Sequence, residues 1–285
     1  MTEQYDIDYL LQDMQNNGFC IARGLINQNR IDAYTSHHDS ASASWMHPLE
    51  IRKQSGWDFP TDIHKRDRVL WDFIMQEKLE EIISTLLIAR EKMLVHELRR
   101  VVPHLSLVYW IAKGQGWHLD EISESMFGIE SPPFELKQIG VWVALGEINE
   151  ESGPFGFVPG SHKYDYRSDE KFHEFRDRYQ LGEYGPIQID YDPSGKPVFG
   201  DGNQIAHETE KFKHIFGDLF DKFITQMISS GQMQPSMFTA QPGDVLFWDG
   251  RLIHCAHKTS PGNLRKSVIA HYHLSDNPAH LPPWV

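Results

Sequence analysis

The stretch Gly116–Asp120, which reads Gly-Trp-His-Leu-Asp, is the segment of this sequence that best predicts how the chain is organised. It follows a run at residues 105–111 that is rich in Val, Leu, Tyr and other strand-forming residues, and then a turn with two glycines. On an extended backbone, side chains two positions apart share one face. We therefore expect His118 and Asp120 to point to the same side, where both can bind one metal ion.

The same His-x-Asp spacing also occurs at His37 and Asp39, so the spacing alone does not identify a site. That second pair lies in a polar stretch, residues 29–44, which is predicted to be helical. Residues two apart on a helix point to different faces, so His37 and Asp39 are not expected to bind one ion together.

Two histidines and one carboxylate form the ligand set that suits non-haem Fe(II) and leaves coordination positions open. The pair at His118 and Asp120 lacks only a second histidine, and the segment 250–272 with its continuation supplies candidates. Four histidines compete for that role: His254, His257, His271 and His273. Spacing within the chain does not by itself choose among them.

Composition limits the class of protein and of partner. The chain has 285 residues, of which 40% are hydrophobic, with 16 Phe and 8 Trp, enough for a sizeable core. We find no internal repeat and no linker, so residues 1–285 are predicted to form one domain. The formal net charge of −13 disfavours nucleic acid and membrane surfaces as partners, and favours a neutral or cationic small-molecule substrate. Oligomeric state is not readable from the sequence.

Two features bear on the compartment. Only two cysteines are present, which indicates a reducing compartment without a disulfide framework. No apolar run has the length to cross a bilayer, and the first nine residues are acidic and unlike a signal peptide. These features predict a cytoplasmic protein.

Hydrophobic periodicity predicts a mostly β fold with flanking α-helices. Helical spacing is found at residues 6–16 and, as one long amphipathic helix, at 69–91. Residues 40–68 lack a clean period and are predicted to be a loop. Short strands are predicted at 19–22, 94–102, 105–111, 136–148, 155–158, 236–240, 244–248 and 265–274. Many short strands with turn signals favour a β-sandwich of the jelly-roll type. The polar insert 164–234, with two helical patches, and the loop 40–68 are candidates for lid and substrate-specificity segments.

Three blocks in order resemble the phytanoyl-CoA dioxygenase (PhyH) family. The first is the segment 243–254, Gly-Asp-Val-Leu-Phe-Trp-Asp-Gly-Arg-Leu-Ile-His, which continues through 259–267. In that family an Arg follows the distal His by eleven residues, and here His254 and Arg265 stand at that separation. The second block joins residues 141–145 to 157–162, and the third is the N-terminal segment 18–24. The resemblance thus extends over residues 18–275.

This resemblance implies Fe(II)- and 2-oxoglutarate-dependent oxygenase chemistry with O2 on a double-stranded β-helix, a jelly-roll or cupin-like fold. By position, it implies that His118, Asp120 and His254 bind the iron. It also implies that Arg265 binds the far carboxylate of 2-oxoglutarate, where its planar guanidinium can form two parallel hydrogen bonds. Ser267, two residues further on, would lie on the same side of the strand and add a hydrogen bond.

Other positions near the implied site leave alternatives open. Tyr109 and Trp142 lie on predicted strands and are candidates to line the cosubstrate pocket, or equally to be ordinary core residues. The chain departs from the family at Leu119, where many relatives carry a polar side chain, and at Cys255 and Ala256. Asp120 is present, whereas related halogenases lack this carboxylate, which favours hydroxylation.

The expected activity is hydroxylation of an unactivated C–H bond in a small metabolite or natural-product intermediate, with succinate and CO2 as coproducts. The same iron-dependent oxidation could instead give desaturation, cyclisation or epimerisation, because the pose of the substrate decides the outcome. Two alternatives come from other classes: a zinc-type metal-dependent hydrolase and a catalytically silent binding protein. The hydrolase alternative gives Arg265 and Ser267 no role.

Overall fold

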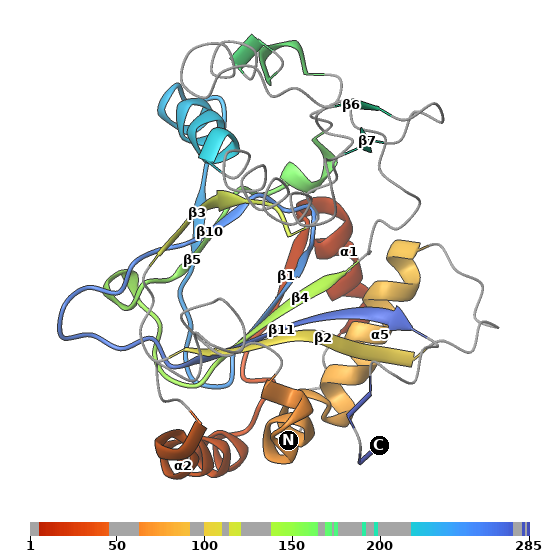
Figure 1. Ribbon diagram of the computed structural model, residues 1–285, viewed down its shortest axis with the longest axis vertical. Helices are drawn as coiled ribbons and strands as arrows, with labels where there is room; N and C mark the ends of the chain where they lie inside the picture. Colours follow the sequence, from red (N-terminus) through yellow and green to blue (C-terminus); the bar gives the residue numbers. More distant parts are fainter. Residues whose placement is uncertain are drawn as a thin grey trace.

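In the computed structural model, two antiparallel sheets face one another, and helices cover the outer side of the larger sheet (Figure 1). The structure describes residues 6–45, 63–91, 100–109, 114–120, 138–164, 169–172, 174–175, 190–191, 197–198, 218–275, 281–282 and 284–285. Among these residues, no helix is long and apolar enough to cross a membrane.

The larger sheet contains five of the described strands in the order β1-β9-β4-β11-β2. They are β1 (Phe19–Ala22), β9 (Val245–Asp249), β4 (Ile139–Ala144), β11 (Ser267–Ser275) and β2 (Arg100–Tyr109). The smaller sheet has the order β3-β10-β5-β8. Its strands are β3 (Gln115–His118), β10 (His254–Ala256), β5 (Phe155–Phe157) and β8 (Ser236–Phe238), and a separate pair is formed by β6 (Asp190–Tyr191) and β7 (Pro197–Val198). Paired strands are antiparallel and are far apart in the sequence. This arrangement is the predicted β-sandwich with flanking helices.

The named helices come mainly from the N-terminal third of the chain. They are α1 (Ile7–Asn17), α2 (Gln28–Trp45), α4 (Arg68–Ile74) and α5 (Glu77–Glu91), with short 3-10 helices η1 (Ile63–Lys65), η3 (Glu150–Ser152) and η4 (Ser161–Lys163). The helix predicted at residues 6–16 is α1, and it ends at Gly18, whose positive φ of 80° is the left-handed conformation that glycine tolerates. Its first turn is capped by the Asp6 side chain, which accepts hydrogen bonds from two backbone N–H groups.

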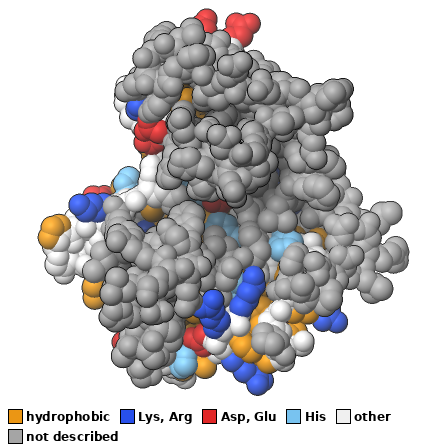
Figure 2. Space-filling view, in the orientation of Figure 1, with side chains coloured by type: hydrophobic (Ala, Val, Ile, Leu, Met, Phe, Trp, Pro, Cys, Tyr) orange, Lys and Arg blue, Asp and Glu red, His pale blue; other side chains and the backbone are white. Residues whose placement is uncertain are grey.

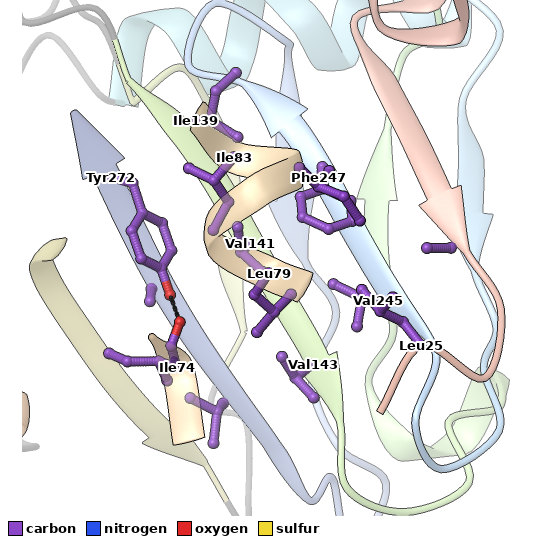
Figure 3. Close-up of a cluster of buried hydrophobic side chains, with 14 of the residues drawn as sticks. Leu25, Ile74, Leu79, Ile83, Ile139, Val141, Val143, Val245, Phe247 and Tyr272 are labelled. Carbon is purple, nitrogen blue, oxygen red and sulfur yellow. Dashed lines mark hydrogen bonds between the residues drawn. The ribbon is translucent and has the colours of Figure 1, made fainter. Parts of the chain in front are cut away.

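Successive side chains of the central strands point to opposite faces of the larger sheet and pack in two separate apolar clusters. On β4, Val141 and Val143 face the helices, where they pack with Leu79 and Ile83 of α5 (Figure 3). The intervening Trp142 faces the other way, into the apolar cluster between the two sheets. This period of two places every second residue of β4, β9 and β11 on the interior face of the sandwich, where a site between the sheets can use it.

The predicted single helix over residues 69–91 is wrong, because the structure has two helices that separate at Met75 and Gln76. The backbone carbonyl of Ile74 accepts a hydrogen bond of 2.9 Å from the Tyr272 hydroxyl on β11 (Figure 3). A helical carbonyl normally accepts from the N–H four residues later. The contact with the sheet thus fixes the chain where the two helices meet.

Two other boundaries also differ from prediction. The two strands predicted at 94–102 and 105–111 are joined, over residues 100–109, into the single strand β2, whose register against β11 shifts between His271 and Tyr272. Pro103 lies next to this bulge and has no N–H to donate, and β2 is an edge strand, where proline is tolerated. The loop predicted at 40–68 begins inside α2 and ends with η1 and α4, while residues 46–62 lie outside the described residues.

The structure describes only some residues of the insert 164–234. Residues 170–172 and 174–175 are helical, as are residues 218–229, in agreement with the two predicted helical patches. The role of this insert and of residues 40–68 as lid segments, and the single domain at 1–285, stay predictions.

Candidate active site

Two paired strands of the smaller sheet bring the predicted histidines together. His118 ends β3 and His254 begins β10, and the two residues are direct partners in the antiparallel register. Their ring centroids lie 4.1 Å apart. The β10 strand was not predicted, so the position of His254 opposite His118 is a finding of the structure.

Asp120 completes the group just beyond the end of β3. Its Oδ1 atom lies 3.4 Å from Nε2 of His254 and 3.9 Å from Nε2 of His118. One ligand atom from each of the three residues lies within 4.8 Å of the other two. Three donor atoms this close together can bind one ion.

Each histidine is held in one orientation by a backbone carbonyl. Nδ1 of His118 lies 2.7 Å from the oxygen of Gly116, and Nδ1 of His254 lies 2.9 Å from the oxygen of Leu252. A carbonyl oxygen only accepts hydrogen bonds, so Nδ1 carries the proton in both rings. The lone pair of each Nε2 is therefore free to bind a metal, and the ring positions are fixed before any ion arrives.

The ionisation states are also those that metal binding requires. Burial, helped by the neighbouring His254, lowers the pKa of His118 to about 3, which keeps its ring neutral at physiological pH. Burial alone would raise the pKa of Asp120, but His254, His271 and His118 together hold the pKa of this carboxyl below its usual range. A neutral imidazole beside an ionised carboxylate needs no proton release to accept a divalent cation.

The second oxygen of Asp120 has a different neighbour, which the sequence analysis did not find. The indole N–H of Trp248 donates to Oδ2 at 2.7 Å. Nδ1 of His271 lies 3.6 Å from the same oxygen; from the sequence, His271 could be a competing ligand, a core residue or a residue beside the metal ligands. Alternation on β9 could have shown that Trp248 faces the interior. Its partner could not be foreseen, because Asp120 lies 128 positions away in the chain.

Arg265, Ser267 and Trp142 form a second polar group in the sandwich interior. The Arg265 side chain is 1% exposed, lies with its guanidinium 5.0 Å from the centre of the Trp142 ring, and donates to the backbone oxygen of Gly153 at 3.1 Å. The Ser267 hydroxyl and the Trp142 indole nitrogen are buried, and neither has a hydrogen-bond partner among the described residues. Buried polar groups in proteins normally have partners. A buried cation beside two such donors fits an anionic ligand.

The other residues considered from the sequence lie outside the group that His118, Asp120 and His254 form. The backbone of Tyr109 is paired with Ser267 in the larger sheet, but its side chain lies outside the described residues. His37 lies on α2, as the helical interpretation required, with its Nε2 atom 3.1 Å from both oxygens of the Asp67 carboxylate. His257 contacts Cys255, with 3.7 Å between Nε2 and Sγ. Among the described histidines, only His254 joins His118 and Asp120 in the possible metal group.

The insert contacts β3 directly. Asp221, on the helix at residues 218–229, accepts a hydrogen bond of 2.6 Å from the backbone N–H of Trp117. A Cβ atom at Gly116 would lie 2.6 Å from the Asp221 carboxyl carbon, so glycine allows this close approach. Leu119, between the two proposed ligands His118 and Asp120, packs in an apolar cluster with Phe220 and Phe223 of the helix. The apolar residue at position 119 therefore has a structural reason.

Figure 2 shows one face of the molecule, on which histidine side chains lie near the centre and Lys and Arg side chains lie below them.

Comparison with known proteins shows the family of this chain. The family model for phytanoyl-CoA dioxygenase (PhyH) matches residues 14–267. The chain belongs to the phytanoyl-CoA dioxygenase family. This confirms the resemblance inferred from the three sequence blocks. No curated protein matched the sequence.

Solved structures share the fold of this PhyH protein. One is the epimerase SnoN in complex with Fe3+, alpha ketoglutarate and nogalamycin RO, with 14% identity, a TM-score of 0.54, and coverage of 94% of this chain and 83% of that one. Another is the carbocyclase SnoK from nogalamycin biosynthesis, with 14% identity, a TM-score of 0.56, and coverage of 95% and 84%. A third is EctD from S. alaskensis with 2-oxoglutarate and 5-hydroxyectoine, with 14% identity, a TM-score of 0.56, and coverage of 92% and 74%. These likenesses confirm the jelly-roll fold.

Proposed function

We propose that this protein is an Fe(II)- and 2-oxoglutarate-dependent oxygenase in which His118, Asp120 and His254 hold the iron. The observation that carries the proposal is the convergence of two Nε2 atoms on one carboxylate oxygen, at 3.4 and 3.9 Å. Both rings already have their Nδ1 protons bound to backbone oxygens, so the donors fit a divalent ion without rearrangement. Membership of the PhyH family supports the same chemistry.

Iron bound here with 2-oxoglutarate and O2 would supply an oxidant that breaks an unactivated C–H bond, with succinate and CO2 as coproducts. The residues of the chain provide placement. His118, Asp120 and His254 would hold the ion through two neutral imidazoles and one carboxylate, a ligand set that suits Fe(II) and would leave coordination positions for exogenous ligands. Stacking of Phe155 on the His254 ring, with centroids 4.9 Å apart, and burial of Leu119 exclude water from the protein side of the site.

We infer that Arg265 binds the far carboxylate of 2-oxoglutarate, assisted by Ser267 and Trp142. The Arg265 guanidinium is buried beside the Trp142 ring, and its planar fork can form two parallel hydrogen bonds with a carboxylate. The buried hydroxyl of Ser267 and the buried N–H of Trp142 are donors that a carboxylate would satisfy. A metal-dependent hydrolase would leave this interior group without a task.

For the reaction itself, we propose hydroxylation of a small metabolite or natural-product intermediate. The filled Asp120 position supports retention of three protein ligands. The printed names of the similar structures include an epimerase and a carbocyclase, so product mass is the deciding observation for this chain. A gain of one oxygen identifies hydroxylation, and a loss of two hydrogens identifies desaturation or oxidative cyclisation. An isomer of unchanged mass identifies epimerisation.

The test is turnover of 2-oxoglutarate to succinate in the presence of Fe(II) and O2. We expect the His118→Ala and His254→Ala proteins to lose turnover, because each removes a proposed ligand. The His257→Ala protein is the matched control, since His257 lies outside the metal group and should keep its activity. Full turnover in the His254→Ala protein would refute the assignment, and activity with Zn2+ but not Fe(II) would support the hydrolase alternative.

A further inference from the structure

We propose that Trp248 is a positioning residue for the metal site, because its indole N–H orients the Asp120 carboxylate so that this ligand binds through one oxygen only. The inference rests on the proposed function and adds a residue to it. It concerns the N–H group, not only the space that the ring fills.

The two oxygens of Asp120 have separate environments. Oδ2 accepts the indole N–H at 2.7 Å, while Oδ1 faces Nε2 of His254 at 3.4 Å and Nε2 of His118 at 3.9 Å. A hydrogen bond to a charged group is among the stronger ones in proteins, and the donor of this one is buried. Rotation of the carboxylate to bring Oδ2 onto the metal would break it.

Single-oxygen binding matters for the number of open positions. An octahedral ion with three single-atom ligands keeps one complete face free, as the facial triad requires. A carboxylate that bound through both oxygens would occupy one of those positions. The position lost would be needed either by the two donor atoms of 2-oxoglutarate or by O2.

The sheet holds the indole in the orientation that this hydrogen bond needs. Trp248 on β9 and His271 on β11 are both register partners of Gly140 on β4, so the three positions form one row across the sheet. A Cβ atom at Gly140 would collide with the indole carbons Cε2 and Cζ2, so the ring lies over this glycine. The absence of a side chain at position 140 thus allows the ring to lie flat across the strand.

Two further rings contact the indole. The His271 ring meets it edge-on at 5.4 Å and 87°, and the Phe155 ring lies 4.8 Å away. His271 cannot substitute for the indole as a donor in the observed geometry, because its Nδ1 is 3.6 Å from Oδ2, beyond hydrogen-bond distance. Trp248 is therefore the group that bonds to the outer oxygen of Asp120 at short range.

The experiment compares Co(II) binding by wild-type protein, Trp248→Phe and Trp71→Phe, using a competing chromophoric chelator. Phe keeps an aromatic ring in the core but removes the N–H. Loss of a hydrogen-bond partner to a metal ligand typically weakens metal affinity by about 10–100-fold, and we expect that loss in Trp248→Phe. The visible spectrum of bound Co(II) should also change, because it reports the number and arrangement of ligand atoms. Trp71 is buried on α4 away from the metal group, so Trp71→Phe should change neither quantity.

The outcomes distinguish this inference from the proposed function. If wild-type protein does not bind Co(II), the metal site and this inference both fail. If wild-type protein binds and Trp248→Phe binds equally well with the same spectrum, the metal site stands and the positioning role of Trp248 is refuted.

A second measurement covers the case in which Trp248→Phe does not fold. In protein labelled with 15N-tryptophan and carrying Trp142→Phe, which removes another buried indole N–H of the described residues, Zn2+ is added and the indole signals are followed. We expect one signal that exchanges slowly with solvent to shift when the ion binds. If no slowly exchanging signal shifts on Zn2+ binding, the inference is wrong.

Discussion

Replacement of Ser267 by Ala should affect stability and cosubstrate binding in opposite directions. Its hydroxyl is fully buried and has no hydrogen-bond partner among the described residues, although it lies on β11 beside the Arg265 position. A buried polar group without a partner costs about 1–3 kcal/mol of folding free energy. Removing it should therefore leave the protein without cosubstrate as stable as the wild type, or more stable by up to that amount.

The same substitution should weaken 2-oxoglutarate binding. A hydrogen bond to a charged group contributes about 1.5–3 kcal/mol, which corresponds to about a 10–150-fold higher Kd for 2-oxoglutarate. Tm without cosubstrate measures the first effect, and anaerobic titration with 2-oxoglutarate in the presence of Fe(II) measures the second.

Ser152→Ala is the matched control. Ser152 is also buried, but its hydroxyl exchanges hydrogen bonds with Asn149 in a capping box. This variant should lose about 1 kcal/mol of stability and keep its affinity for 2-oxoglutarate. A Ser267→Ala protein that is destabilised and binds 2-oxoglutarate like the wild type would show that the hydroxyl has a structural role instead.

Two further predictions concern the support of the site and the acid sensitivity of the fold. Asp221→Ala removes the acceptor of the Trp117 N–H on β3, so the free energy of unfolding should fall by about 1–3 kcal/mol. Metal affinity should fall with it, because β3 carries His118. The control is Asp218→Ala, at a half-exposed carboxylate on the same helix, which should change neither quantity. Equal metal affinity in the two variants would contradict the proposed support of β3. Burial, with Lys65 nearby, lowers the pKa of His64 to about 4 in the folded protein. Because the pKa is about 6.5 in the unfolded chain, the unfolded state binds a proton more readily than the folded state does. The free energy of unfolding should therefore decrease as the pH falls from about 6.5 toward 4. His64→Gln should flatten that region of a denaturation-versus-pH curve by up to about 3 kcal/mol, and an unchanged slope would refute the prediction.

Much of the fold could be predicted because the interior strands are short apolar runs rich in β-branched and aromatic residues. The period of two along β4, β9 and β11 gives strands whose odd and even residues face different layers, and the His-x-Asp pair is readable because it lies on an extended segment. The separation of eleven residues between His254 and Arg265 predicted the third metal ligand, because three other histidines compete with His254 for that role.

What could not be predicted depends on contacts between distant segments. The break between α4 and α5 involves a hydrogen bond from Tyr272, which lies 198 positions away. Trp248 reads as an ordinary core residue until Asp120 is placed next to its indole nitrogen. Likewise, Leu119 departs from the family pattern for a reason that becomes visible only when the insert helix packs on β3.

The central claim is that His118, Asp120 and His254 hold Fe(II) in a form that also binds 2-oxoglutarate. The most direct test is visible absorbance under anaerobic conditions as Fe(II), and then 2-oxoglutarate, is added to the metal-free protein. We expect a charge-transfer band that appears only when both are present, and that is absent in His254→Ala but present in His257→Ala. A wild-type protein that binds Fe(II) but develops no band with 2-oxoglutarate would keep the metal site and contradict the oxygenase assignment.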